Sequence, residues 1–113
     1  MTLKEWQSSV DRWIQEIGVR YFNETTNALL LSEEVGEFNK IIARVYGEQS
    51  FKIEKTKDEI KKELTDELGD IFFVLTCLAN QLEIDLSLSL QQNILKKTNR
   101  DFTRHKTNKK LKE

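Results

Sequence analysis

Two short segments place acidic side chains where they could bind a metal ion. Residues 34–37 and 67–70 share one order: acid, apolar, glycine, acid. Their four carboxylates belong to Glu34, Glu37, Glu67 and Asp70. Both segments lie in stretches with helical apolar spacing, where a glycine costs roughly 0.5–1 kcal/mol relative to alanine. Four carboxylates on two helices predict a site for a hard divalent cation, and oxygen-only ligands favour Mg²⁺, Mn²⁺ or Ca²⁺ over Zn²⁺.

The helical spacing directs these acids toward apolar faces rather than toward solvent. At about 100° per residue, Glu34 falls within the apolar face of its helix and Glu37 at the edge of that face. Glu33 lies further out on the same helix as Glu34, whereas Glu67 and Asp70 fall within the apolar face of the helix that contains residues 67–70. Buried like charges are unstable unless a carboxylate protonates or a cation lies between them. The repeated inward pair therefore predicts one shared metal site.

Two other interpretations of the acids stay open. Any one of them alone would more often be a solvated or salt-bridged surface residue. A di-iron site of the ferritin type needs Glu-x-x-His on its helices, and the only histidine, His105, lies in the C-terminal tail. The sequence therefore gives the di-iron interpretation little support.

Four helical segments must position these residues. Apolar spacing predicts helices over residues 3–17, 27–46 and 58–82, and a fourth from Ser87 or Ser89 through residue 95 and beyond. Thr25, Thr26 or Asn27 is the expected N-cap of the second helix. Short connections and the absence of a strand pattern predict an all-α fold, an antiparallel four-helix bundle.

Composition limits the class of protein. The 113 residues are enough for one domain, with a formal net charge of −1 that gives no drive toward nucleic acid or a membrane. The single cysteine, Cys77, excludes an intrachain disulfide and is typical of a reducing compartment. The N-terminus lacks the apolar stretch of a signal peptide. We expect a cytoplasmic protein that binds neither membrane nor, stably, nucleic acid.

The acidic segments resemble a known family. Residues 33–37 and 67–70 match the EExxE…ExxD signature of MazG-like nucleotide pyrophosphohydrolases, members of the all-α NTP pyrophosphatase superfamily. Weaker matches flank the signature, at residues 21–22, 46–48, 71–75 and 96–101. The resemblance is to short single-domain members and implies a helical domain over residues 1–105, followed by a basic polar tail over residues 106–113. It also implies a homodimer or a homotetramer.

The resemblance implies Mg²⁺-dependent hydrolysis of a nucleoside triphosphate between the α and β phosphates, giving a monophosphate and pyrophosphate. Such an activity could remove noncanonical or excess nucleotides. The family's metal ligands correspond to Glu34, Glu37, Glu67 and Asp70, with Glu33 as a further site acid. Glu37 or Glu33 could activate the attacking water; Glu34 is a third possibility.

Basic and aromatic residues are candidates for the rest of the substrate. Lys96, Arg100 and Arg104 could bind the phosphates, or they could form a solvated basic helix end that complements the helix dipole. Candidates for base binding are Trp13, Tyr21, Asn80 and Asn99. Core packing is the alternative for Trp13, which lies seven residues after Trp6 on one apolar stripe.

Two non-catalytic functions remain as alternatives. The chain could be a helical module that keeps the fold and binds a nucleotide or a protein partner. It could also be a metal-binding regulator without hydrolysis. The intact set of four acids argues against a simple scaffold, because a scaffold has no need of acids on an apolar face.

Overall fold

The chain folds into four α-helices, seen in a computed structural model that describes residues 1–112. The helices are α1 (Leu3–Glu16), α2 (Glu24–Tyr46), α3 (Lys57–Gln81) and α4 (Leu86–Asp101), and a short 3₁₀ helix covers Lys109–Lys112. No strand occurs within the described part of the chain. The predicted all-α fold is confirmed, while Glu113, the last residue of the predicted tail, lies outside the described residues.

Side-chain caps set where the helices begin. Thr2 and Thr56 form capping boxes at the starts of α1 and α3, each with the glutamate three residues later. Two predicted caps are wrong. Asn23, not a residue of 25–27, caps α2 by accepting from the Thr26 amide, and Asp85 caps α4 where a serine was expected. In both cases an Asn or Asp lies earlier in the sequence, and its side chain accepts from an amide of the first turn.

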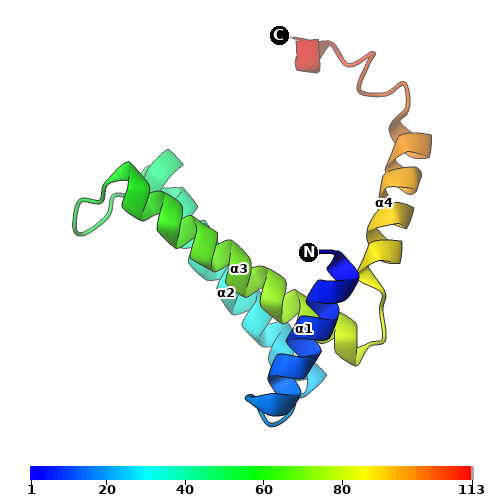
Figure 1. Ribbon diagram of the computed structural model, residues 1–113. Helices are drawn as coiled ribbons and strands as arrows, with labels where there is room; N and C mark the ends of the chain where they lie inside the picture. The colour runs from blue at the N-terminus through cyan, green and yellow to red at the C-terminus, as the bar shows by residue number, and fades with distance from the viewer. Residues whose placement is uncertain (113) are drawn as a thin grey trace.

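The helices α2 and α3 form a long antiparallel hairpin, and α1 packs across the later part of α3 (Figure 1). A small core lies at this crossing, where Val10 and Ile14 of α1 meet Cys77 of α3. The Trp6 indole donates a hydrogen bond of 2.8 Å to Oγ1 of Thr76, which is fully buried. The crossing fixes the end of the hairpin that lies nearest the N-terminus of α2.

Helix α4 leaves this assembly instead of lying alongside it (Figure 1). Its axis is bent by 103° from that of α3, and Gln7 of α1 holds its start by accepting from the Leu86 amide at 2.9 Å. Beyond that point its apolar residues, such as Ile94 and Leu95, are exposed. All four predicted helices therefore exist, but α4 does not close a bundle within one chain.

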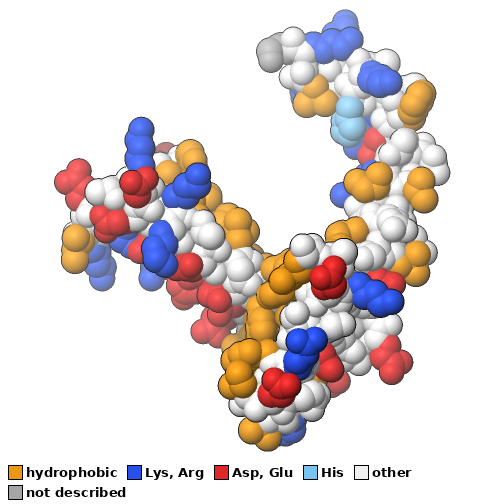
Figure 2. Space-filling view, viewed as in Figure 1, with side chains coloured by type: hydrophobic (Ala, Val, Ile, Leu, Met, Phe, Trp, Pro, Cys, Tyr) orange, Lys and Arg blue, Asp and Glu red, His pale blue; other side chains and the backbone are white. Residues whose placement is uncertain are grey.

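The shape is open for a protein of this size. The radius of gyration is 18.0 Å, whereas a compact domain of this length has about 13 Å. The accessible surface is 9278 Å², against about 6,500 Å² expected for a folded monomer of this mass. Apolar side chains gather along the hairpin and beside α1, and separate apolar side chains lie on the α4 arm (Figure 2). Much apolar surface thus lacks a partner within the single chain.

No single helix of the described chain is long and apolar enough to cross a membrane. The bent pair of α3 and α4 passes that test jointly, by length and composition only.

Candidate functional site

Three acidic side chains meet in the middle of the hairpin. Glu34 projects from α2, and Glu67 and Asp70 project from α3, so that one carboxylate oxygen from each lies within 4.8 Å of the others. Antiparallel packing of the two helices brings the two acidic segments opposite each other. We call these three residues the acid cluster. The predicted convergence of the two segments is therefore present in the fold.

The acid cluster carries negative charge that protein groups leave uncompensated. Burial raises the pKa of the Glu34 carboxyl, as do a hydrogen bond to Glu67 and the charge of Asp70. Oε2 of Glu67 is buried and has no hydrogen-bond partner among the described residues. A buried acceptor without a donor is costly, and a cation would satisfy it. Because all three atoms that could ligate a metal are carboxylate oxygens, the site fits a hard divalent cation.

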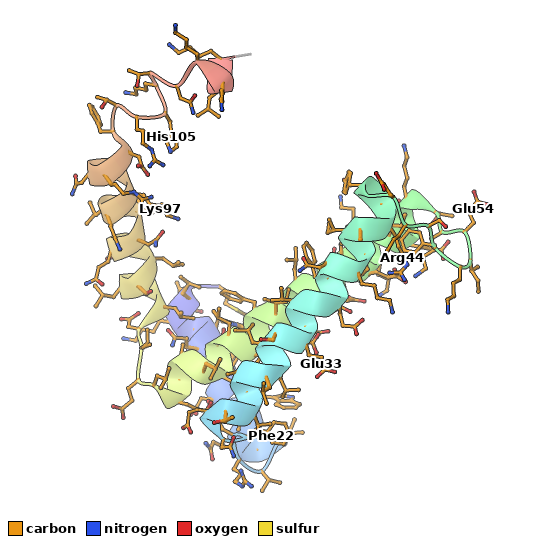
Figure 3. The ribbon with its side chains drawn as sticks, turned by 180° about the vertical axis from the view of Figure 1, so that it is seen from behind. Phe22, Glu33, Arg44, Glu54, Lys97 and His105 are labelled. Carbon is orange, nitrogen blue, oxygen red and sulfur yellow. The ribbon has the colours of Figure 1, made fainter. Side chains whose placement is uncertain are left out.

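The other two predicted site acids lie beside the acid cluster. Glu37 is exposed and borders a groove together with Glu67, one helical turn beyond Glu34. Glu33 is exposed on the side of α2 (Figure 3). Three of the four predicted metal ligands thus come together, and the roles of Glu37 and Glu33 stay predictions.

The two glycines of the acidic segments have open space around them. A Cβ added at Gly36 or Gly69 would meet no atom within 4 Å. Gly69 also borders a pocket of about 310 Å³ that it shares with Leu3 and Trp6 of α1. The space stays open to a second copy or to substrate.

Sequence reasoning missed a groove that borders the acid cluster and is lined by basic and acidic side chains in equal number. The groove has a volume of about 500 Å³ and lies between the second half of α2, the first half of α3 and their connection. Lys40, Arg44 and Lys52 line it, next to Glu37 and Glu67. A signal for the first two was available, because they follow Glu37 by three and seven residues and so share its side of α2.

The predicted phosphate-binding residues lie elsewhere. Lys96, Arg100 and Arg104 are on or just beyond α4, and this part of the chain projects away from the hairpin, as the labelled Lys97 and His105 show (Figure 3). Arg100 and Arg104 pair with Asp101 at 2.8 and 3.3 Å. Within one chain, these residues do not lie beside the acid cluster.

Two of the predicted base-binding residues line an apolar cavity. Trp13 and Tyr21 border a space of about 290 Å³, together with Phe22 and Phe73. Burial raises the pKa of Tyr21 to about 12, helped by the hydrogen bond that its hydroxyl donates to Asp11 at 2.7 Å. The cavity lies at the α1 end of the hairpin, and two of its lining residues, Leu30 and Val74, are one helical turn from Glu34 and Asp70.

The two predicted base-binding amides have other positions. Asn80 donates to the Tyr21 hydroxyl at 3.1 Å and to the Gln7 carbonyl at 3.0 Å, so it ties α3 to α1. Asn99 is exposed on α4, remote from the cavity. Neither lines the cavity.

Comparisons with known proteins point to one family. Residues 22–107 match the model of the MazG nucleotide pyrophosphohydrolase domain. The chain is 37% identical to the uncharacterised protein YpjD of Bacillus subtilis (strain 168), over 91% of this chain and 89% of YpjD.

Solved structures agree with this match. The crystal structure of YpjD from Bacillus subtilis superposes with a TM-score of 0.74 and 34% identity, covering 85% of this chain and 94% of YpjD. A Bacillus-conserved MazG protein, a nucleotide pyrophosphohydrolase, gives a TM-score of 0.70 and 31% identity, covering 85% of this chain and 88% of that protein.

Proposed function

Because the chain belongs to the MazG nucleotide pyrophosphohydrolase family, we propose that it hydrolyses nucleoside triphosphates between the α and β phosphates, with Mg²⁺ as cofactor. The observation that carries the proposal is the acid cluster, with three carboxylates within 4.8 Å and a buried Glu67 oxygen that lacks a donor. A triphosphate is itself strongly negative, so only a cation-loaded cluster could accept it.

Different side chains of the hairpin have different roles in the proposed reaction. Glu34, Glu67 and Asp70 would hold the ion, which, when bound, neutralises phosphate charge and lowers the pKa of a water. Glu37, with Glu33 as the second candidate, accepts the proton of the attacking water. A bond forms between the water oxygen and the α phosphorus, and the bond from that phosphorus to the oxygen bridging to the β phosphate breaks. The electron pair of the broken bond leaves with pyrophosphate.

The aromatic cavity is the proposed place for the base. Trp13, Tyr21 and Phe22 offer ring faces and edges there. Stacking on aromatic rings suits every nucleobase, so this cavity would bind the base without choosing it by stacking alone. Removal of noncanonical or excess nucleotides in the cytoplasm is the role that we propose for this activity.

We also propose that the working form is a homodimer or a homotetramer. The excess of about 2,800 Å² over a compact monomer has the size of the surface that a stable interface buries, and the exposed apolar residues of α4 belong to it. Only in a second copy could Lys96, Arg100 and Arg104 approach an acid cluster. Light scattering tests this directly, and a monomeric mass at micromolar concentration would contradict it.

The activity itself is tested with a panel of canonical and modified nucleoside triphosphates in Mg²⁺. We expect release of pyrophosphate and the monophosphate in equal amounts. Loss of activity in EDTA and recovery with Mg²⁺ would test the cofactor. No turnover across a broad panel would contradict the proposal and favour a non-catalytic module.

A further inference from the structure

The side-chain amide of Asn27, near the start of α2, has a fixed orientation. The residue is only 4% exposed, and its Nδ2 donates to the Phe22 carbonyl at 3.3 Å and to Oε1 of Gln81 at 2.9 Å. Gln81 is oriented in turn by Phe22, because its Nε2 donates to the same carbonyl at 2.6 Å. A carbonyl oxygen can only accept, so these hydrogen bonds identify the nitrogen of each amide.

The oxygen of the Asn27 amide has no donor. No hydrogen bond reaches its Oδ1 from residues 1–112, since both bonds of the amide are made by Nδ2. The atom is not enclosed either, because Oε2 of Glu67 is the only fully enclosed side-chain polar atom without a partner in the described part of the chain. Asn27 borders the aromatic cavity. Its oxygen is therefore a free acceptor at the wall of that cavity.

The other polar side chains that line the cavity offer no comparable acceptor. The Tyr21 hydroxyl already donates to Asp11. Burial raises the pKa of the Cys77 thiol to about 11, so the thiol stays neutral and is at most a weak donor. The guanidinium of Arg20 is exposed and can only donate. Within the described chain, the hydrogen-bonding character of the buried wall is thus set by Asn27.

The position of Asn27 relative to the acid cluster matches the length of a nucleotide. Asn27 precedes Glu34 by seven residues on the same face of α2, a separation of about 10 Å along the helix axis. With the α phosphate at the acid cluster and the base in the cavity, the edge of the base farthest from the sugar extends toward Asn27. Cytosine and adenine carry an amino donor on that edge, whereas uracil, thymine and guanine carry an oxo acceptor.

We propose that Asn27 is a specificity-determining residue that selects nucleotides with an amino group on this edge of the base, those of cytosine or adenine. The inference rests on the proposed function, which places the base in the aromatic cavity. An amino group donates to Oδ1 of Asn27. An oxo group places acceptor against acceptor, and turning the amide to relieve this contact breaks its bonds to Phe22 and Gln81.

The test uses pairs of nucleotides that differ in the group at this edge. Isothermal titration in Mg²⁺ would compare cytidine with uridine monophosphate, and adenosine with inosine monophosphate, on the wild-type protein. The amino member of a pair should bind at least about tenfold more tightly, since a buried polar group left unpaired costs on that scale. A preference within only one pair would support the proposal and identify the base as a pyrimidine or a purine.

Two variants separate selection of the base from support of the fold. Asn27→Leu removes the acceptor, so the ratio of amino to oxo affinity should fall to near one. Gln81→Glu is the matched control: it keeps an acceptor for Asn27, loses the donor to Phe22, and does not line the cavity. It should change both affinities of a pair equally and keep their ratio. Circular dichroism checks the folding of both variants.

The wild-type protein alone can overturn the proposal. Equal binding of amino and oxo nucleotides, or no binding of any monophosphate, would do so whether or not Asn27→Leu folds. An unchanged ratio in Asn27→Leu, or an equal loss of the ratio in Gln81→Glu, would also overturn it. Amino selectivity in binding without hydrolysis of any triphosphate would contradict only the proposed function. Hydrolysis of triphosphates without amino selectivity would contradict only the role of Asn27.

Discussion

Acidic side chains have different partners in two regions of the molecule. One region is the hairpin of α2 and α3, and the other is the arm formed by α4 and the following residues (86–112). In the hairpin, Glu34 faces Glu67 and Asp70, acid against acid, and one buried oxygen lacks a donor. In the arm, Asp101 is surrounded by Arg100, Arg104 and His105 within ion-pair distance. The hairpin therefore needs a ligand to balance its charge, whereas the acid of the arm is already balanced by its own neighbours.

The two regions also differ in how they bury apolar surface. The hairpin packs along its length and receives α1, whose Val10 and Ile14 are buried against Cys77. The arm exposes Leu88, Ile94 and Leu95. The hairpin thus leaves acids without a partner, whereas the arm pairs its one acid and leaves apolar side chains without a partner.

The largest expected effect is on activity, from neutralising one acid of the cluster. Asp70→Asn or Glu67→Gln should reduce kcat/KM by at least about 100-fold, because each removes a proposed ligand to the ion. Folding should be retained, since the change also relieves repulsion. Asp58→Asn, an exposed acid in the first turn of the same helix, is the control. Retained turnover in both cluster variants would remove the site assignment.

The next effect is on stability and compares two isoleucines. Ile14→Ala, in the core at the α1 crossing, should lower the free energy of unfolding by about 2–4 kcal/mol. Ile94→Ala, on the exposed face of α4, should have little effect in a dilute monomer. The denaturation of both variants should be followed at several protein concentrations. A concentration-dependent loss for Ile94→Ala would show that the arm packs against a second copy.

A smaller effect is the pH dependence of stability, which should differ between the hairpin and the arm. The folded-state pKa of Glu34 is raised, so its contribution to stability is present below its usual value of 4.5 and is lost as pH rises through the raised pKa. In EDTA, the melting temperature should therefore fall as the pH rises above 4.5. Mg²⁺ should abolish this pH dependence of the melting temperature. Glu34→Gln should abolish it even without metal. If the melting temperature of Glu34→Gln showed the same pH dependence as the wild type, the dependence would not come from Glu34.

The smallest effect has the opposite sign and belongs to the arm. Arg100 beside Asp101 holds the pKa of that carboxyl below its usual 3.8, so the stabilisation is present above 3.8 and is lost as pH falls through the lowered pKa. Asp101→Asn should change neither activity nor melting temperature measurably at neutral pH, because the basic partners of Asp101 are exposed to solvent and such pairs contribute little. A large loss would show that Asp101 has a partner outside its own helix.

The angular positions of Glu34 and Glu67 on their helices predicted two members of the acid cluster, whereas the prediction of Asp70 rested more on the family resemblance. Glu34, Glu67 and Asp70 were expected on apolar faces, and antiparallel pairing of two long helices brought them together. Helix existence was predictable for the same reason, since apolar spacing is local. The exact first residues of α2 and α4 were harder to predict, because Asn23 and Asp85 competed with nearby Thr and Ser residues as caps.

Two features depended on information that one sequence does not carry. The groove forms only when the α2–α3 connection folds back, so the position of Lys52 beside Arg44 could not be derived from helical spacing. The direction of α4 depends on Gln7, which holds the preceding connection and the start of α4 through the Ile84 carbonyl and the Leu86 amide. This contact spans most of the chain, and no local pattern indicates it.

Both tryptophans of the chain lie on α1, and their surroundings differ. Trp6 donates its indole hydrogen to a buried threonine, whereas Trp13 is 46% exposed and meets Phe73 edge-on at the border of the aromatic cavity. The tryptophan fluorescence of the protein therefore comes from one helix. A nucleobase in the cavity should alter the emission of Trp13 while that of Trp6 stays constant, so Trp6→Phe would leave an optical reporter of base binding.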